Sequence, residues 1–141
     1  MFMYIFSIAL IVASNILYNI SQKSTPEQAN PFSALFVTYL LAGIISAVAF
    51  YLSKAEKTLL QSCHELNWTS LALAVSIVGL EFGYIMAYRA GWNISVGSLV
   101  ANILLAIALI PIGIFFYHEG FGLNKVLGVI LCIAGLILIN K

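Results

Sequence analysis

The sequence predicts an all-α integral membrane protein, a bundle of about five transmembrane helices. Its 141 residues are 62% hydrophobic and only 8% charged, whereas soluble domains are about 25% charged. Five apolar runs follow one another along the chain, at residues 2–20, 32–52, 68–90, 94–117 and 126–139. None of them alternates strictly between apolar and polar residues, as a barrel strand would. Helices are therefore expected, because backbone groups inside lipid must pair within their own segment.

The first four runs reach about the 20 residues that a helix needs to cross a hydrocarbon core of about 30 Å. The run 126–139 is shorter and has polar flanks, so it spans only with snorkelling or local thinning of the bilayer. A four-span chain with a re-entrant tail is the structural alternative. We expect one transmembrane domain over residues 1–141. It should be a multi-pass protein in the lipid bilayer of a cell membrane, with the bacterial inner membrane as the expected compartment.

Charge and cysteine patterns exclude several other classes of function. The formal net charge is +1 and the cationic residues are scattered singly, so no nucleic-acid partner is expected. Cys63 and Cys132 lack the spacing of metal ligands or of a disulfide pair. No nucleophile, metal cluster or catalytic dyad is visible. We therefore expect no enzyme activity, no catalytic residue, no metal and no cofactor.

The cationic residues give no preferred orientation in the membrane. Five spans place equal numbers of Lys and Arg on the two sides: Lys54, Lys57 and Lys125 on the N-terminal side, and Lys23, Arg89 and Lys141 on the other. The positive-inside rule needs an excess on one side. One strongly placed residue could still decide the orientation, but the balance favours a chain that inserts both ways round.

Glu81 is the carboxylate inside an apolar run, near the middle of residues 68–90. A central ionised residue costs about 2.5 to 3.5 kcal/mol on insertion scales, so the helix should hide it and desolvation should favour the neutral acid. A carboxyl that exchanges a proton for a solute is the core of a coupled transporter. The alternative is a neutral carboxyl that ties helices together. Tyr84 and Tyr88 follow at i+3 and i+7, on the same helical face.

Further polar residues lie on the first and fourth spans. Asn15 and Tyr18 lie within one turn of each other on the first, and Ser98 and Asn102 are stacked at i and i+4 on the fourth. Each pair also fits ordinary contact between helices. Together with Glu81 they predict a polar, solute- or proton-binding path. Arg89 lies about 12 Å along the helix from Glu81, too far for direct pairing, so we expect it to snorkel to the interface.

The last run carries small residues on one face. Gly128, Cys132 and Gly135 follow each other at i, i+4 and i+7. Small side chains let two helices approach closely, although the spacing is not a strict GxxxG motif. We expect this face to form a dimer interface. In the fourth span, Pro111 removes a backbone hydrogen bond and should kink or loosen the helix.

These features resemble the drug/metabolite transporter superfamily, and specifically a single-repeat member of its EamA-type branch. The C-terminal half carries the resemblance: Ala90-Gly91, the run to Pro111, Glu119, and the stretch 128–140. That last stretch is also similar to the dimer-forming fourth helix of small multidrug resistance transporters. Those proteins place an essential glutamate in the first helix, where this sequence has none.

The resemblance implies a transporter built from one five-span repeat. Larger members have about ten spans in two inverted halves whose interface forms the substrate path. A single half is then expected to pair as an antiparallel homodimer. The implied function is secondary transport or export of a small metabolite or organic cation by alternating access. Glu81, singled out by its place in an apolar run, is the candidate residue for proton coupling or solute binding. The rival interpretation is a non-transporting subunit of a larger membrane complex.

Overall fold

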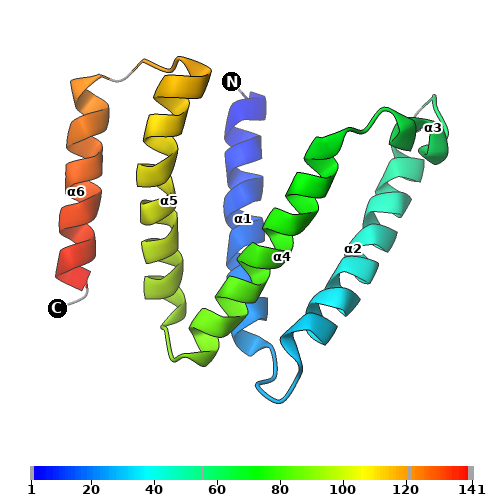
Figure 1. Cartoon of the computed structure of the whole chain (residues 1–141), viewed down its shortest axis with the longest axis horizontal. Helices are drawn as coiled ribbons and strands as arrows, with labels where there is room; N and C mark the ends of the chain where they lie inside the picture. Colours follow the sequence, from blue (N-terminus) through cyan, green and yellow to red (C-terminus); the bar gives the residue numbers. More distant parts are fainter. Residues whose placement is uncertain (1, 55, 121, 140–141) are drawn as a thin grey trace. The chain divides into compact units, whose positions relative to one another are not determined.

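A computed structural model of the chain describes residues 2–54, 56–120 and 122–139 (Figure 1). Within these residues the chain forms six helices and no strand: α1 (Phe2–Ser24), α2 (Pro31–Leu52), α3 (Leu59–His64), α4 (Trp68–Arg89), α5 (Ile94–Tyr117) and α6 (Leu123–Ile139). The predicted all-helical fold is confirmed. In this described part α1, α2, α4 and α5 are long and apolar enough to cross a membrane. Helix α6 has 17 residues, or about 26 Å at 1.5 Å per residue.

Local sequence signals explain where the helices begin. Asn30 caps α2 by accepting a hydrogen bond from the Phe32 N–H, and Pro31 occupies the first helical position. Asn67 caps α4 in the same way through the N–H of Thr69, at 3.0 Å. Asparagine is among the best N-cap residues because its side chain satisfies a backbone donor that has no partner in the helix. Each predicted run therefore agrees with its helix to within a few residues.

The connection at residues 53–67 is not wholly irregular. It contains helix α3, which begins with a capping box: Thr58 accepts from the Gln61 N–H, and the Gln61 side chain accepts from the Thr58 N–H. This reciprocal pairing satisfies two backbone donors at once. An ion pair between Lys57 and Glu65 ties the two ends of α3 together.

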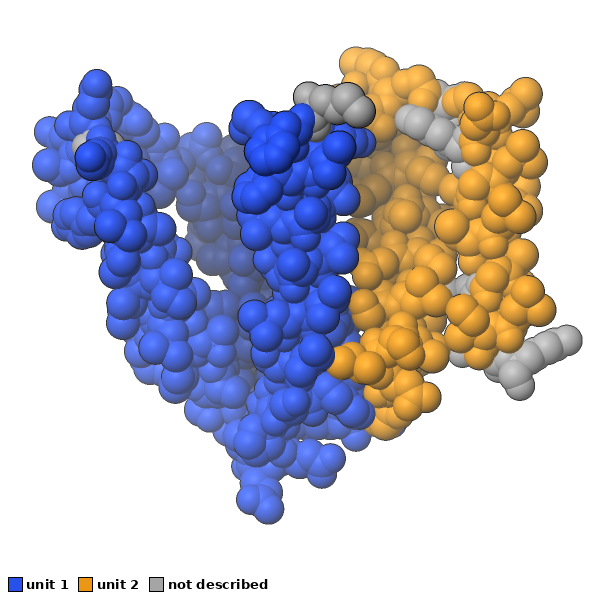
Figure 2. Space-filling model, turned by 180° about the vertical axis from the view of Figure 1, so that it is seen from behind, with its two compact units in different colours: residues 1–90 blue, residues 91–141 orange. Residues whose placement is uncertain are grey.

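The chain divides into two compact units, drawn in different colours in Figure 2. Unit 1 is Met1–Ala90 and contains α1 to α4; unit 2 is Gly91–Lys141 and contains α5 and α6. The expected single domain over residues 1–141 stays a prediction. Lys141, which entered the charge count, and residue 140 of the sequence resemblance lie outside the described residues.

Helix α4 packs against both α1 and α2 in unit 1. The buried side chains gather near the α1–α2 connection: Asn19 of α1, Leu35 of α2, and Ile85 and Tyr88 of α4. Away from it, α1 and α2 diverge (Figure 1). Apolar side chains there are exposed, as Leu71 is at 72%. Such surfaces suit a hydrocarbon solvent, in which apolar groups need no burial by protein.

Helix α5 packs against α6 in unit 2. Helix α5 continues through Pro111 as one element, so Pro111 does not end it. It stops at His118, whose φ of 52° places this residue in the left-handed region. The chain then turns so that the Glu119 carboxyl lies over Gly113, where an added Cβ would be 3.1 Å from Oε2. A larger residue at Gly113 would displace that carboxylate.

Candidate functional site

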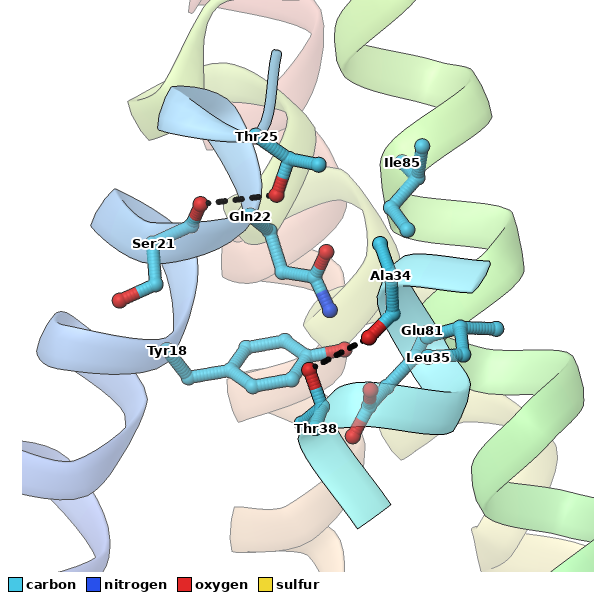
Figure 3. Close-up of a pocket in the computed structure, with 9 residues that line it drawn as sticks. All are labelled: Tyr18, Ser21, Gln22, Thr25, Ala34, Leu35, Thr38, Glu81 and Ile85. Carbon is cyan, nitrogen blue, oxygen red and sulfur yellow. Dashed lines mark hydrogen bonds between the residues drawn. The ribbon is translucent and has the colours of Figure 1, made fainter. Parts of the chain in front are cut away.

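A pocket of about 120 Å³ lies within unit 1, between α1, α2 and α4 (Figure 3). One water needs about 10–15 Å³ by the same measure, so several waters or a small solute would fit. Its wall is mixed in character. The polar members are Tyr18, Ser21, Gln22, Thr25, Thr38 and Glu81, and the apolar members are Ala34, Leu35 and Ile85.

Helical spacing explains why these side chains meet. Tyr18, Ser21 and Gln22 lie at i, i+3 and i+4 on α1, so they share one face, and Thr25 follows directly after the helix. Helix α2 supplies Ala34, Leu35 and Thr38, and α4 supplies Glu81 and Ile85; each set lies within about one helical turn. Each helix therefore contributes one short stripe, and the three stripes converge because α4 packs against both other helices.

Glu81 reaches the pocket from α4 and is partly buried. Its Oε2 atom is shielded from solvent and has no hydrogen-bond partner among the described residues. The hydroxyl oxygens of Tyr18 and Tyr39 are likewise shielded from solvent and make no hydrogen bond of good geometry with a described residue. The Tyr39 hydroxyl lies close enough to the Glu81 carboxyl for a weak, poorly aligned hydrogen bond, and the Tyr18 hydroxyl lies similarly near the Gln22 side chain and within range of the Glu81 charge. Two tyrosine hydroxyls, one from α1 and one from α2, thus lie near the Glu81 carboxyl of α4.

Two cations hold the end of the unit next to this pocket. The Arg89 Nη2 atom donates to the carbonyl oxygens of Pro26 and Ala29, at 2.9 and 2.7 Å. The Lys23 Nζ atom donates to the carbonyl oxygen of Tyr88 at 3.2 Å and lies 5.6 Å from the centre of its ring. The guanidinium thus anchors the α1–α2 connection at the end of α4, and the expectation that Arg89 snorkels to the interface stays a prediction. Neither cation lines the pocket.

The chain matches the EamA-like transporter family over residues 2–141. This chain belongs to the EamA-like transporter family. The resemblance drawn from the C-terminal half is therefore confirmed and extends over nearly the whole chain. The EamA match and the apolar helices show a multi-pass integral membrane protein, a transporter of the drug/metabolite type. No curated protein and no solved structure gave a significant match.

Membership in the EamA family bears on two further expectations. The described part, with four long apolar helices and a shorter one, is consistent with a single EamA repeat. EamA members are transporters rather than enzymes, in agreement with the absence of a recognisable catalytic motif. Within the residues that the structure describes, no group of three or more His, Cys, Asp or Glu side chains could hold a metal ion.

The sequence-predicted site residues of unit 1 fall into different environments. Tyr18 and Glu81 line the pocket. Tyr84 packs edge-on against Tyr18, with ring centres 5.6 Å apart. Tyr88 is buried and donates its hydroxyl hydrogen to Asn19 of α1, which ties two helices together. Asn15 is exposed, and its carbonyl oxygen accepts from the Asn19 side chain at 2.8 Å.

The other predicted residues belong to unit 2. Asn102 donates to the Ser98 hydroxyl at 3.4 Å on one face of α5. On α6, apart from the neighbouring residues and the helix's own nearby backbone, no described atom lies within 4 Å of a Cβ built at Gly128 or Gly135, and the Cys132 thiol is free and exposed. This face of α6 is open in the single chain. Roles for all of these residues in binding or dimer formation stay predictions.

Several residues in or beside the pocket were missed from the sequence. Ser21, Gln22, Thr25 and Thr38 line it, whereas Asn19 and Tyr39 lie outside its lining. One usable signal was spacing, because Ser21, Gln22 and Thr25 repeat the face of Tyr18. A second was the pair Thr38 and Tyr39, polar groups inside a strongly apolar run. Neither signal reveals that these faces meet at Glu81, which depends on packing among three helices.

Proposed function

We propose that this EamA-family chain is a secondary transporter that moves a small metabolite or organic cation across the cell membrane by alternating access. The observation that carries the proposal is the position of Glu81, a carboxyl within a membrane-spanning helix that opens into a pocket shared by three helices. Ionisable groups inside spans face the interior of the bundle and mark solute or proton paths. The family supplies the transport function, and the pocket supplies a place for the solute.

Proton exchange at Glu81 would couple the two states. An ionised carboxylate surrounded by hydrocarbon is strongly disfavoured, whereas a bound cation or a proton neutralises it. The empty pocket would therefore take up a proton before it faces the opposite side, and the solute would displace that proton. For a solute with one positive charge, such competition makes the site alternate between two neutral states, as an exchanger requires.

The proposal includes a second copy of the chain in antiparallel orientation. Two observations support it: the open, small-residue face of α6, and the equal number of cationic residues on the two sides of a five-span topology. A repeat paired with its inverted copy resembles the two inverted halves that form the substrate path in larger transporters. Ser98 and Asn102 on α5 are then candidates to complete the path.

The test measures flux in proteoliposomes containing the purified full chain. A thermal-shift screen of amines, amino acids, sugars and nucleosides selects the solute, because ligands of the native state raise its apparent stability. An imposed pH gradient should accelerate flux of that solute through the parent. Glu81→Gln keeps the shape of the side chain but cannot ionise, so its flux should no longer respond to pH.

Glu27→Gln is the matched control, because Glu27 is exposed in the α1–α2 connection and should leave the pH response intact. An unchanged pH profile in Glu81→Gln would make Glu81 a structural carboxyl and remove proton coupling from the proposal. A parent chain that moves no solute, yet co-purifies with one membrane partner, would establish the subunit interpretation instead.

A further inference from the structure

Helix α3 is amphipathic, although it lies outside the membrane-spanning helices. Leu59, Leu60 and Cys63 lie at i, i+1 and i+4, so they share one face of the helix. The Leu66 N–H donates to the Cys63 carbonyl at 3.2 Å, which continues the turn and brings Leu66 to the same face. The remaining residues of the segment are polar: Gln61, Ser62, His64 and Glu65. Segment 59–66 therefore has one apolar face and one polar face.

The apolar face of segment 59–66 is largely exposed in the structure. Leu60 is 75% exposed and Leu66 is 62% exposed, and the Cys63 thiol is free and exposed as well. Among the described residues, the helices that pack extensively are α1 with α4, α2 with α4, and α5 with α6, so α3 is not one of them. Apolar side chains that gather on one exposed face mark a surface that contacts a membrane or another protein.

The neighbouring helices place this face at a membrane surface. Helix α2 ends at Leu52 and α4 begins at Trp68, and both helices are long and apolar enough to cross the bilayer. Both ends of the connection between them therefore lie at the same membrane surface, at the end of unit 1 opposite the α1–α2 connection (Figure 1). Tryptophan is enriched at the boundary between membrane and water. Residues 65–67 alone separate α3 from Trp68, so α3 lies close to the level of the lipid headgroups.

The polar face excludes positions deeper in the bilayer. Lys57 and Glu65 form an exposed ion pair, and charged groups are costly in the hydrocarbon core. Bulk water, in turn, would leave the apolar face unshielded. At the interface each face meets a suitable environment. The charged residues of the connection cancel, so its attraction to lipid needs no anionic headgroup: they are Lys54, Glu56, Lys57 and Glu65.

We propose that α3 is a bilayer-surface anchor, with the apolar face of segment 59–66 buried among the lipids and the polar face in water. Amphipathic helices of this kind insert their apolar face roughly 5–10 Å into the boundary between headgroups and acyl chains. The anchor holds the adjoining ends of α2 and α4 at a fixed depth in the bilayer. This inference is independent of the proposed transport function, because it concerns lipid contact outside the pocket.

The test attaches a nitroxide spin label to Cys63 of the full chain in phosphatidylcholine vesicles. Cys132→Ser removes the other cysteine from every sample. Electron paramagnetic resonance then measures collisions of the label with oxygen, which concentrates in lipid, and with a nickel chelate, which stays in water. The matched control combines Cys63→Ser with Ser62→Cys, which moves the label by one residue to the polar face. The ratio of oxygen to nickel collisions should be several-fold higher at position 63 than at position 62.

A pair of substitutions tests whether the apolar side chains hold the helix at the bilayer. Leu59→Gln combined with Leu60→Gln makes the apolar face polar, so the collision ratio at Cys63 should fall several-fold as the label moves into water. His64→Gln, on the polar face, is the matched control and should leave the ratio unchanged. Should the double leucine variant fail to insert, the comparison of label positions 63 and 62 still decides the proposal.

Each other combination of collision rates would overturn the anchor. Frequent nickel collisions at Cys63 would place the apolar face in water, and few collisions with either reagent would show that protein, such as a second copy of the chain, covers it. Equally high ratios at positions 63 and 62 would place the whole segment in hydrocarbon. A ratio that stays high in the double leucine variant would mean that other contacts hold α3 in place. A ratio that is high at Cys63 and falls in both comparisons upholds the anchor, even where the vesicles show no transport.

Discussion

Tyr88→Phe removes one hydroxyl from the buried contact between α1 and α4. Tyr88 is 4% exposed and Asn19 is 7% exposed, and the Tyr88 hydroxyl donates to the Asn19 Oδ1 atom. Phenylalanine keeps the ring, and with it the apolar packing and the contact with Lys23. The substitution therefore isolates one hydrogen bond and leaves Asn19 Oδ1 without its donor.

Two reference scales bracket the expected loss of stability. In water-soluble proteins, a buried acceptor left without a partner costs about 1–3 kcal/mol. In bilayers, double-mutant cycles for polar contacts between helices average about 0.6 kcal/mol and reach about 1.7 kcal/mol, because the unfolded state within the membrane also finds partners. Both groups here are almost fully buried, so we expect a value near 1 kcal/mol, in the upper half of the bilayer range.

The assay is reversible unfolding in mixed micelles of increasing SDS content, for the parent, Tyr88→Phe, Asn19→Leu and the double variant. Each single change strands the remaining partner, whereas the double change removes both groups. The double variant should therefore lose less stability than the sum of the single losses, by about 0.6–1.7 kcal/mol. Tyr4→Phe, at a position 76% exposed on α1, is the control and should change nothing. Additive losses, within about 0.3–0.5 kcal/mol, would refute the hydrogen bond as a stabilising contact.

Three further predictions concern other parts of the chain. Arg89→Gln loses the two bonds that hold the α1–α2 connection, so deuterium uptake by that connection should rise while uptake by α5 stays unchanged. Leucine at both Gly128 and Gly135 should reduce cross-linking between the final helices of two copies without preventing membrane insertion. Replacing Lys54 and Lys57 by Gln should bias the N-terminal side outward, which labelling of single cysteines from outside the cell would detect.

Each of these predictions has an opposing result. Unchanged deuterium uptake in the Arg89 variant would mean that the connection is held by other contacts. Cross-linking equal to that of the parent would exclude the α6 face as the dimer interface. Labelling of the parent from one side only, with a biased variant fully active when expressed alone, would contradict the antiparallel pair. Replacing Lys23 and Lys141 by Gln supplies the opposite bias. If the pair is antiparallel, each biased variant expressed alone should lose activity, and co-expression of the two should restore it.

The helix positions could be predicted because each span is an apolar run bounded by polar capping residues. Asn30 with Pro31, and Asn67, mark helix starts that agree with the run boundaries. Helix α3 was missed because it is too short to show a period, although its capping box Thr58 to Gln61 is visible as a local pattern. Signals of this kind depend only on residues that are close together in the sequence, so they can be recognised without the structure.

The candidate site could be predicted only in part, for a different reason. Glu81 stands out because a carboxylate within an apolar run is energetically unusual wherever it lies. Gln22 and Thr38 have no such distinction until α1 and α2 bring them to the same pocket. The partners of Arg89 are backbone carbonyls, which every residue has, so no pattern of side chains could identify them. In both cases the contacts depend on how the helices pack against one another.

The buried residues of unit 1 contact α1 near one end of the helix, so that a rotation about this point would move the other end most. Its core contact, Asn19, lies near one end, and the helix extends about 25 Å from there to Phe2 at 1.5 Å per residue. A rotation of α1 by about 10° around Asn19 would displace its N-terminal end by roughly 4 Å. The Tyr18 side chain, one residue from Asn19, would hardly be displaced. The N-terminal end of α1 can therefore move by several ångströms while the α1 residues that line the pocket stay almost in place.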